Sequence, residues 1–243
     1  MLRKTALSEV PVGTTFEIWN HKYTVLDKGR DKIFVLAAEI ETMMQFREDD
    51  DVYAVAQNDF RDSPIRNWLN DDYLGILQKN GLKNSDILDL EVDLKCTIGQ
   101  HEYGKDKVKI GLLTLEEYDK YYDVIPCVDS SWWLATPWKT PSYSRYASST
   151  SDVWYVCYDG DYSCWGYNIN TCGVRPALNL SPSLLVVWED ASCTEDNGNW
   201  DEYIKYLHKW ATEHSDKFFV EYNPVCYYEW KLRYKGKTDQ DEN

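Results

Sequence analysis

The chain has 243 residues, of which 43% are hydrophobic and 15% aromatic, so it can build a sizeable core and is not a mainly disordered protein. Its 41 acidic and 26 basic residues give a formal net charge of −15. This charge disfavours electrostatic binding to nucleic acids or to anionic membranes, because both reward basic patches. We therefore expect neither nucleic acid nor membrane among its partners.

The N-terminal segment MLRKTALSEVPVG lacks the apolar stretch of a secretory signal peptide. The longest apolar run, SLLVVW at 183–188, is far too short to span a bilayer. The seven cysteines form no C-x-x-C pair, and we expect them to be reduced thiols. The expected location is the cytoplasm, or a phage- or cell-surface-associated state after release.

The first half of the chain predicts a β-meander followed by a helix. Residues 15–40 carry β-branched and aromatic runs that are interrupted at Asn20–His21 and at 28–31. The helix is predicted to begin after the N-cap Ser63, with Pro64 at its first position. Its buried face is expected to carry the apolar residues at helical spacing, which are Ile65, Trp68, Leu69, Tyr73, Ile76 and Leu77.

A second helix is predicted from Thr114, where Thr-Leu-Glu-Glu has the form of a capping box, and Tyr118, Tyr121 and Tyr122 continue it. Helical periodicity then disappears between 132 and 180, which favours short strands and tight turns. The run VWYVCY at 153–158 leads into Asp159–Gly160, a hairpin dipeptide. Strand alternation places Val153, Tyr155 and Cys157 on one face and Trp154, Val156 and Tyr158 on the other.

The composition changes after Trp188 to a polar linker. Residues 195–243 predict an amphipathic helix and a strand pair, and a unit of this size is marginal alone. We therefore expect an α+β protein with a main domain at 11–188 and a small α+β extension at 195–243 docked on it.

No catalytic, metal or cofactor site is predicted. The four histidines show no metal-binding spacing, and the common hydrolase, nucleotide and dinucleotide signatures are absent. Cys157, Cys164 and Cys172 fall in the loop-rich region. Nothing basic adjoins Cys157 or Cys164 in the sequence, so we interpret these cysteines as small apolar residues.

Two features of the motifs at 130–140 and 172–178 predict structural roles. Because adjacent strand residues face opposite ways, one of Trp132 and Trp133 should enter the core while the other packs under a neighbouring segment or lines a surface. Arg175 precedes Pro176 among apolar residues. It is expected to act as a clamp on loop carbonyls or a carboxylate.

SSWWLATP at 130–137, followed by GVRPALNLS at 173–181, resembles a bacterial and phage domain-of-unknown-function family with W-W-L-R-S-P-like and G-V-R-P-A-L-like motifs. Three upstream segments extend the resemblance over about 11–182, namely VGTTFEIWNHKYTVLDKGRDKIFVLAAEI, SPIRNWLNDDYL and DKVKIGLLTLEEYDKYY. Its structural-motif residues here are Trp132, Trp133, Gly173, Arg175 and Pro176. The chain departs from the family at Ala135 and Thr136, where the family has arginine and serine.

That family is similar to the C-type lectin-like fold, in the subgroup that contains formylglycine-generating enzymes and the variable proteins of diversity-generating retroelements. The resemblance implies a mixed α+β domain whose loop-rich C-terminal part displays a ligand-binding face. The candidate ligand-binding residues are Trp138, Tyr143, Tyr146, Tyr155, Tyr158, Asp159, Tyr162, Tyr167, Asn168 and Asn170.

Retroelement variation changes adenines, so variable codons can encode Tyr, Ser, Asp, Gly, Cys, Arg or Asn but not Trp. The window 143–172 is rich in these residues, and Trp154 and Trp165 would then be fixed scaffold. A plain tyrosine-rich β region accounts for the composition equally well.

Three functions remain open. The leading one is a non-enzymatic ligand-binding module for a protein or a glycan, such as the variable protein of a diversity-generating retroelement. The alternative is an acidic phage or mobile-element protein that occupies a basic host protein by nucleic-acid mimicry. The third is an enzyme of the formylglycine-generating type, which would need a copper-binding cysteine pair that no motif here matches.

Overall fold

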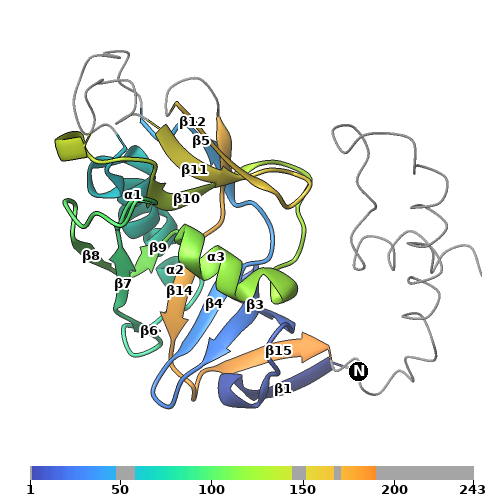
Figure 1. The fold of residues 1–243 in the computed structure, drawn as a ribbon. Coiled ribbons are helices and arrows are strands. Elements are labelled where there is room, and N and C mark those ends of the chain that lie inside the picture. The colour runs from blue at the N-terminus through green and yellow to red at the C-terminus, as the bar shows by residue number, and fades with distance from the viewer. Residues whose placement is uncertain (1, 48–57, 144–151, 167–170, 190–243) are drawn as a thin grey trace, which may run out of the picture. The chain divides into compact units, whose positions relative to one another are not determined.

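Two β-sheets form the frame of the protein, which we describe from a computed structural model (Figure 1). The structure describes residues 2–47, 58–143, 152–166 and 171–189, without the side chains of 143, 165 and 166. Residues 2–189 form one compact unit. It is a mixed α+β unit made mostly of strands, which confirms the predicted class.

The larger sheet has eight strands. In spatial order these are β1 (Leu2–Ala6), β15 (Leu185–Glu189), β2 (Thr15–Ile18), β3 (His21–Lys28), β4 (Ile33–Ala37), β14 (Ala177–Leu180) and β6 (Ile87–Leu88), with β9 (Ile110–Gly111) also paired to β14. The meander predicted over 15–40 is therefore confirmed as β2, β3 and β4. Strand β1 lies before residue 11, where the main domain was expected to begin, and pairs antiparallel with β15.

The smaller sheet has five strands. Their order is β12 (Tyr162–Gly166), β11 (Asp152–Val156), β10 (Trp132–Pro137), β13 (Cys172–Val174) and β5 (Thr42–Met44). A separate hairpin consists of β7 (Leu90–Asp93) and β8 (Lys105–Val108).

Two strand paths pass from one sheet into the other. β4 continues into β5, and β13 continues into β14, so the β4–β14 and β5–β13 pairs form two antiparallel ladders separated by a short junction. The backbone remains bonded across this junction, where Ala37 N donates to Pro176 O and Glu41 N donates to Val174 O. The junction holds the small sheet in a fixed position on the large one.

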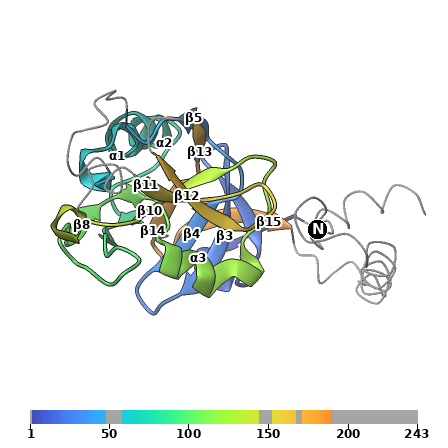
Figure 2. The same cartoon turned by 45° about the horizontal axis from the view of Figure 1, so that its top comes forward.

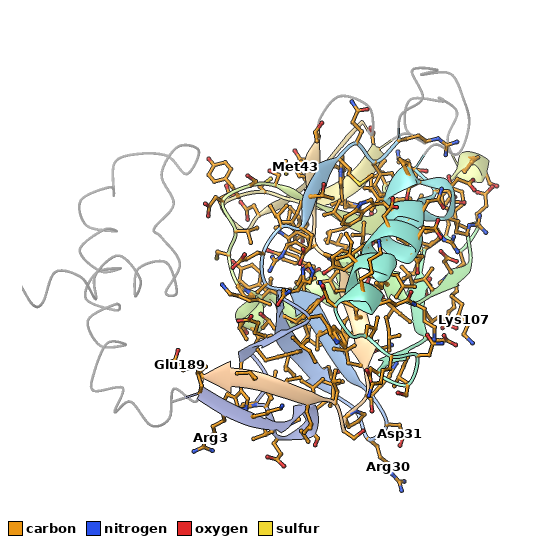
Figure 3. All side chains as sticks on the ribbon, turned by 180° about the vertical axis from the view of Figure 1, so that it is seen from behind. Arg3, Arg30, Asp31, Met43, Lys107 and Glu189 are labelled. Carbon is orange, nitrogen blue, oxygen red and sulfur yellow. The ribbon has the colours of Figure 1, made fainter. Side chains whose placement is uncertain are left out.

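Helices cover both faces of the large sheet. One helix runs through α1 (Pro64–Trp68), a π-helical turn (Leu69–Tyr73) and α2 (Leu74–Lys79), and its Tyr73 hydroxyl lies 2.8 Å from the Tyr23 hydroxyl on β3. Helix α3 (Leu115–Tyr121) packs on the opposite face, where Tyr121 meets Phe34 of β4. The views from opposite sides agree, since α3 is in front in Figure 1 and α1–α2 in Figure 3.

Short 3-10 helices complete the described elements, at Leu7–Glu9, Phe60–Asp62, Tyr122–Val124 and Pro141–Tyr143. Both predicted helix starts are confirmed. The Ser63 hydroxyl caps the Arg66 amide with Pro64 at N1, and Thr114 forms a complete capping box with Glu117.

Ile76 was expected on the buried face of the first helix, but it is 41% exposed, so that prediction is wrong. The buried residues Ile65, Leu69, Tyr73 and Leu77 follow a spacing of four. The π-helical turn explains this, because its wider turn shifts the phase of everything that follows it.

The predicted extension at 195–243 lies outside the described residues. Within the described part, no helix is both long and apolar enough to cross a bilayer.

Candidate ligand-binding site

Strand β10 anchors the candidate site with two fully covered tryptophans. The Trp132 ring meets Tyr118 at 5.7 Å, and the Trp133 ring meets Phe46 at 5.6 Å on the other face. Each ring is 1% exposed, and Trp133 Nε1 donates to Met44 O at 2.9 Å. The predicted alternation is confirmed, and both faces of β10 are part of the core.

Arg175 lies at the junction of the two sheets and binds main-chain carbonyls there. Its Nε donates to Ala37 O at 3.1 Å and its Nη2 to Ala38 O at 3.2 Å, while the guanidinium lies 4.7 Å from the Trp132 ring centre. Pro176 has no amide hydrogen to offer Ala37 O in the β ladder. The arginine side chain supplies that missing donor.

Gly173 completes this motif through close packing. A Cβ at this position would lie 2.6 Å from Ile40 Cδ1 and 2.8 Å from Ile40 Cγ1. Only the absence of a side chain lets β13 approach the junction this closely. The residues Gly173, Arg175 and Pro176 therefore join the sheets.

The positions at which the chain departs from the family motif are both inside the core. Ala135 is fully buried, and its amide donates to Leu113 O at 2.8 Å. The Thr136 hydroxyl accepts from the Leu115 amide at 2.8 Å, at the start of α3. The main chain of Ala135 and the side chain of Thr136 therefore hold the start of α3 on β10.

A row of aromatic rings leads from this core to the surface. Trp138 lies 5.3 Å from Trp154, Trp154 lies 5.4 Å from Tyr162, and Tyr162 lies 6.3 Å from Tyr118. Trp154 is 9% exposed. It therefore supports both Trp138 and Tyr162 from below.

Three exposed tyrosines lie at or beside this row, and we call Tyr122, Tyr158 and Tyr162 the tyrosine surface. Their exposed fractions are 55%, 71% and 44%. Tyr162 belongs to the row, the Tyr122 ring lies 5.8 Å from Tyr118, and Tyr158 lies in the hairpin turn that follows β11. They come from the segment after α3 and from the β11–β12 hairpin, which lie side by side (Figures 1 and 2).

The hairpin turn below these rings is held in place. Gly160 has a φ of +88°, which suits glycine, and its carbonyl accepts from the Tyr118 hydroxyl at 2.6 Å. Asp159 Oδ1 accepts from the Asp161 amide at 3.1 Å. The tip therefore has a defined shape from which Tyr158 projects.

The predicted ligand-binding residues do not all share one face. Tyr155 is half-buried and packs on Trp133, with ring centres 6.0 Å apart, on the face of the small sheet opposite Trp154 and Tyr162. Burial raises the pKa of the Tyr155 hydroxyl. Trp138, Tyr158, Asp159 and Tyr162 belong to the other face or to the turn.

Other predicted positions cannot be placed. Tyr146, Tyr167, Asn168 and Asn170 lie outside the described residues, and for Tyr143 only the backbone is described, at the end of a 3-10 helix.

The buried Asn58 side chain connects the two ends of the segment between residues 139 and 152. Asn58 Nδ2 donates to Lys139 O and to Asp152 O, each at 2.9 Å, and its Oδ1 accepts from the Tyr103 hydroxyl at 2.8 Å. Trp138 N also donates to Asp152 O. Residues 139 and 152 are thus fixed side by side by groups far away in the sequence.

The cysteines of the small sheet are poor candidates for thiolate chemistry. Cys157, Cys164 and Cys172 are free thiols whose pKa is raised, in each case mainly by burial, and for Cys172 to about 11. A raised pKa keeps a thiol protonated at neutral pH.

Tyr118 and Tyr122 belong to the site although the sequence pattern placed them only on a helix. Their spacing of four does predict that they share a helix face. No sequence signal places that face beside a hairpin tip about forty residues later, because that contact depends on how α3 docks on β10.

Among known proteins, the chain is similar to one domain family. No curated protein and no solved structure matches the chain. One family model does match a part of the chain that is less than half of its length. This part runs from just before β8 to the end of β14 and contains the tryptophan pair, the β11–β12 hairpin and the Arg175 clamp. Residues 99–182 match the family model described as Domain of unknown function (DUF6273).

Proposed function

We propose that the protein is a non-enzymatic ligand-binding module with a C-type lectin-like fold, and that its tyrosine surface contacts a protein or a glycan. The observation that carries this proposal is the exposure of Tyr122, Tyr158 and Tyr162, two of which, Tyr122 and Tyr162, pack on the buried Tyr118 ring. Tyrosine offers a large, rigid contact area at low entropic cost, and a hydroxyl for hydrogen bonds.

Two further features support a recognition role. Hot spots of protein interfaces are enriched in Tyr and Trp that are held in place before binding, as the contacts of Tyr162 with Trp154 and Tyr118 hold it here. The arrangement also suits the variable protein of a diversity-generating retroelement. In that case Trp154 would be the fixed base, and Tyr158 and Tyr162 would be variable positions.

The proposal predicts that alanine replacement of Tyr158 and Tyr162 together removes binding. The intact chain and Y158A/Y162A are each screened against a random peptide display library and a glycan array. We expect ligands selected by the intact chain to bind the variant at least about 30-fold more weakly, which is the loss expected if even one of the two tyrosines is an interface hot spot of about 2 kcal/mol. Tyr158→Ala alone, at a highly exposed position, covers the case in which the double variant fails to fold.

The matched control is L185A/I76A, which removes two exposed apolar side chains elsewhere on the domain. It should bind like the intact chain. Circular dichroism and the melting temperature establish that each variant is folded. Failure to select any ligand, or equal binding by Y158A/Y162A, would contradict the proposed function.

A further inference from the structure

Exposed aspartates occur in both segments that carry the tyrosine surface. Asp159 and Asp161 lie on the hairpin turn, and both are exposed. Asp119 and Asp123 are exposed on α3 and on the segment that carries Tyr122. The two segments are adjacent, because a Cβ at position 160 would lie 3.5 Å from the Tyr122 hydroxyl.

Among the residues that the structure describes, positive charge does not balance these aspartates. In the described part of the chain, none of the four aspartates forms an ion pair. Lys120, the cation within α3, donates instead to Asp27 of β3 and to the Tyr121 hydroxyl. Arg175 is fully buried. The surface therefore combines exposed tyrosine rings with unneutralised carboxylates.

This combination is best matched by a cationic side chain. The guanidinium of arginine stacks on tyrosine rings and forms paired hydrogen bonds with a carboxylate, and the lysine ammonium also binds over aromatic faces. A neutral glycan would stack on the same rings but would leave the negative charge without a partner. Opposite charges also speed the approach of a basic partner.

We infer that the partner of the tyrosine surface is a basic protein segment, whose Arg or Lys side chains contact Tyr122, Tyr158 and Tyr162 between the carboxylates of Asp159 and Asp161. The inference rests on the proposed function and names its partner class. It differs from general charge mimicry, because the binding is localised at one hairpin.

The test uses the intact chain and three probes. These are the basic peptide Ac-GRGKGRGKGRGK-NH2, its acidic counterpart Ac-GEGDGEGDGEGD-NH2 and the neutral oligosaccharide chitotriose. Binding is measured by calorimetry and by NMR shifts of the tyrosine rings. We expect the basic peptide alone to bind, and to bind more weakly as NaCl is added.

Two variants with the same change in net charge give the decisive comparison. D159N/D161N removes the charges of the hairpin, and Asn keeps the oxygen that accepts from the Asp161 amide in the turn. D71N/D72N removes two exposed charges on the π-helical turn that precedes α2. We expect the first to weaken peptide binding about tenfold and the second by less than about twofold.

Each other outcome has a defined meaning. Equal weakening by the two variants would overturn the inference in favour of diffuse charge attraction. Tyrosine-dependent binding of chitotriose, unaffected by D159N/D161N, would overturn the basic partner and leave the proposed function standing. Unchanged peptide binding by Y158A/Y162A would also overturn the inference, because the peptide would then bind elsewhere. No binding of the basic peptide would overturn the inference alone, because the library and array screens test the function separately.

Discussion

Arg175 is a buried cation that donates to the main chain of the opposite strand path. Burial lowers its pKa to about 9, which still leaves the guanidinium charged at neutral pH. The Trp132 ring compensates part of the lost hydration through its face, and two carbonyls accept hydrogen bonds. A lysine at this position has no planar fork and could not reach both carbonyls in the same way.

We therefore predict that Arg175→Lys destabilises the domain by about 2 kcal/mol or more, because the carbonyls of Ala37 and Ala38 lose their donors inside the protein. Chemical denaturation measures the change. The control is Arg30→Ala at the exposed β3–β4 turn (Figure 3), which should remain within about 0.5 kcal/mol of the unmodified chain. An unchanged midpoint for Arg175→Lys would show that the guanidinium geometry does not hold the junction.

At the scale of the element, α3 begins with a capping box whose acidic member, Glu117, is half-buried. The Glu117 carboxylate accepts from Thr114 N at 2.8 Å and from the Thr114 hydroxyl at 3.0 Å. Burial raises the pKa of Glu117, and this effect outweighs the opposing effect of these hydrogen bonds and of Lys120. The ionised side chain therefore caps the helix at an electrostatic cost.

The sign of the pH dependence follows from this raised pKa. At pH values between the pKa of Glu117 in the unfolded chain and its higher pKa in the folded chain, the native state binds more protons than the unfolded state. The contribution of Glu117 to stability is therefore largest at acid pH and falls as the pH rises through the pKa of the folded state. We predict that Glu117→Gln, which keeps the acceptor oxygen, is at least as stable as the unmodified chain at pH 7. The difference in stability between Glu117→Gln and the unmodified chain should shrink as the pH is lowered toward the pKa of Glu117 in the unfolded chain.

Urea denaturation at several pH values tests this prediction. The comparison variant is Glu117→Ala, which loses the cap and should be about 1 kcal/mol less stable than Glu117→Gln at every pH, because neither replacement titrates. A glutamine variant that is less stable than the unmodified chain at pH 7, with a gap that closes at acid pH, would reverse the sign and contradict the account.

Elements defined by local chemistry could be predicted from the sequence, whereas their pairing could not. Ser63 and Thr114 mark helix starts because a cap is satisfied within one turn. The separation of Tyr155 from Tyr162 depends on the register of the β11–β12 hairpin, in which Tyr155 pairs with Ser163 and Val156 with Tyr162. Ile76 was misplaced because a π-helical turn cannot be seen in a regular helical pattern.

The same distinction holds for the candidate site. The tyrosine-rich hairpin could be found from its composition and from the Asp159–Gly160 turn. The contribution of Tyr122 could not, because it depends on the docking of α3 beside β10, which Thr136 and Tyr118 fix through long-range contacts. The base around Asn58 joins positions more than eighty residues apart, so it too required the folded chain.

At the scale of the whole molecule, the charge of −15 opposes compaction. The described ion pairs include exposed ones, such as Lys105–Glu91 and Lys22–Glu39, and pairs of this kind contribute little. Repulsion among the excess carboxylates acts over longer distances, and salt screens it. Added salt should therefore remove more repulsion than attraction.

We predict that raising NaCl from about 20 mM to about 300 mM at pH 7 increases the melting temperature by about 2 °C or more, because the screening length falls well below the size of the domain. Differential scanning calorimetry measures the shift. The control is the same pair of salt concentrations near pH 4.7, the isoelectric point, where net repulsion vanishes and the shift should disappear. A melting temperature that falls with NaCl at pH 7 would mean that specific ion pairs outweigh the net charge.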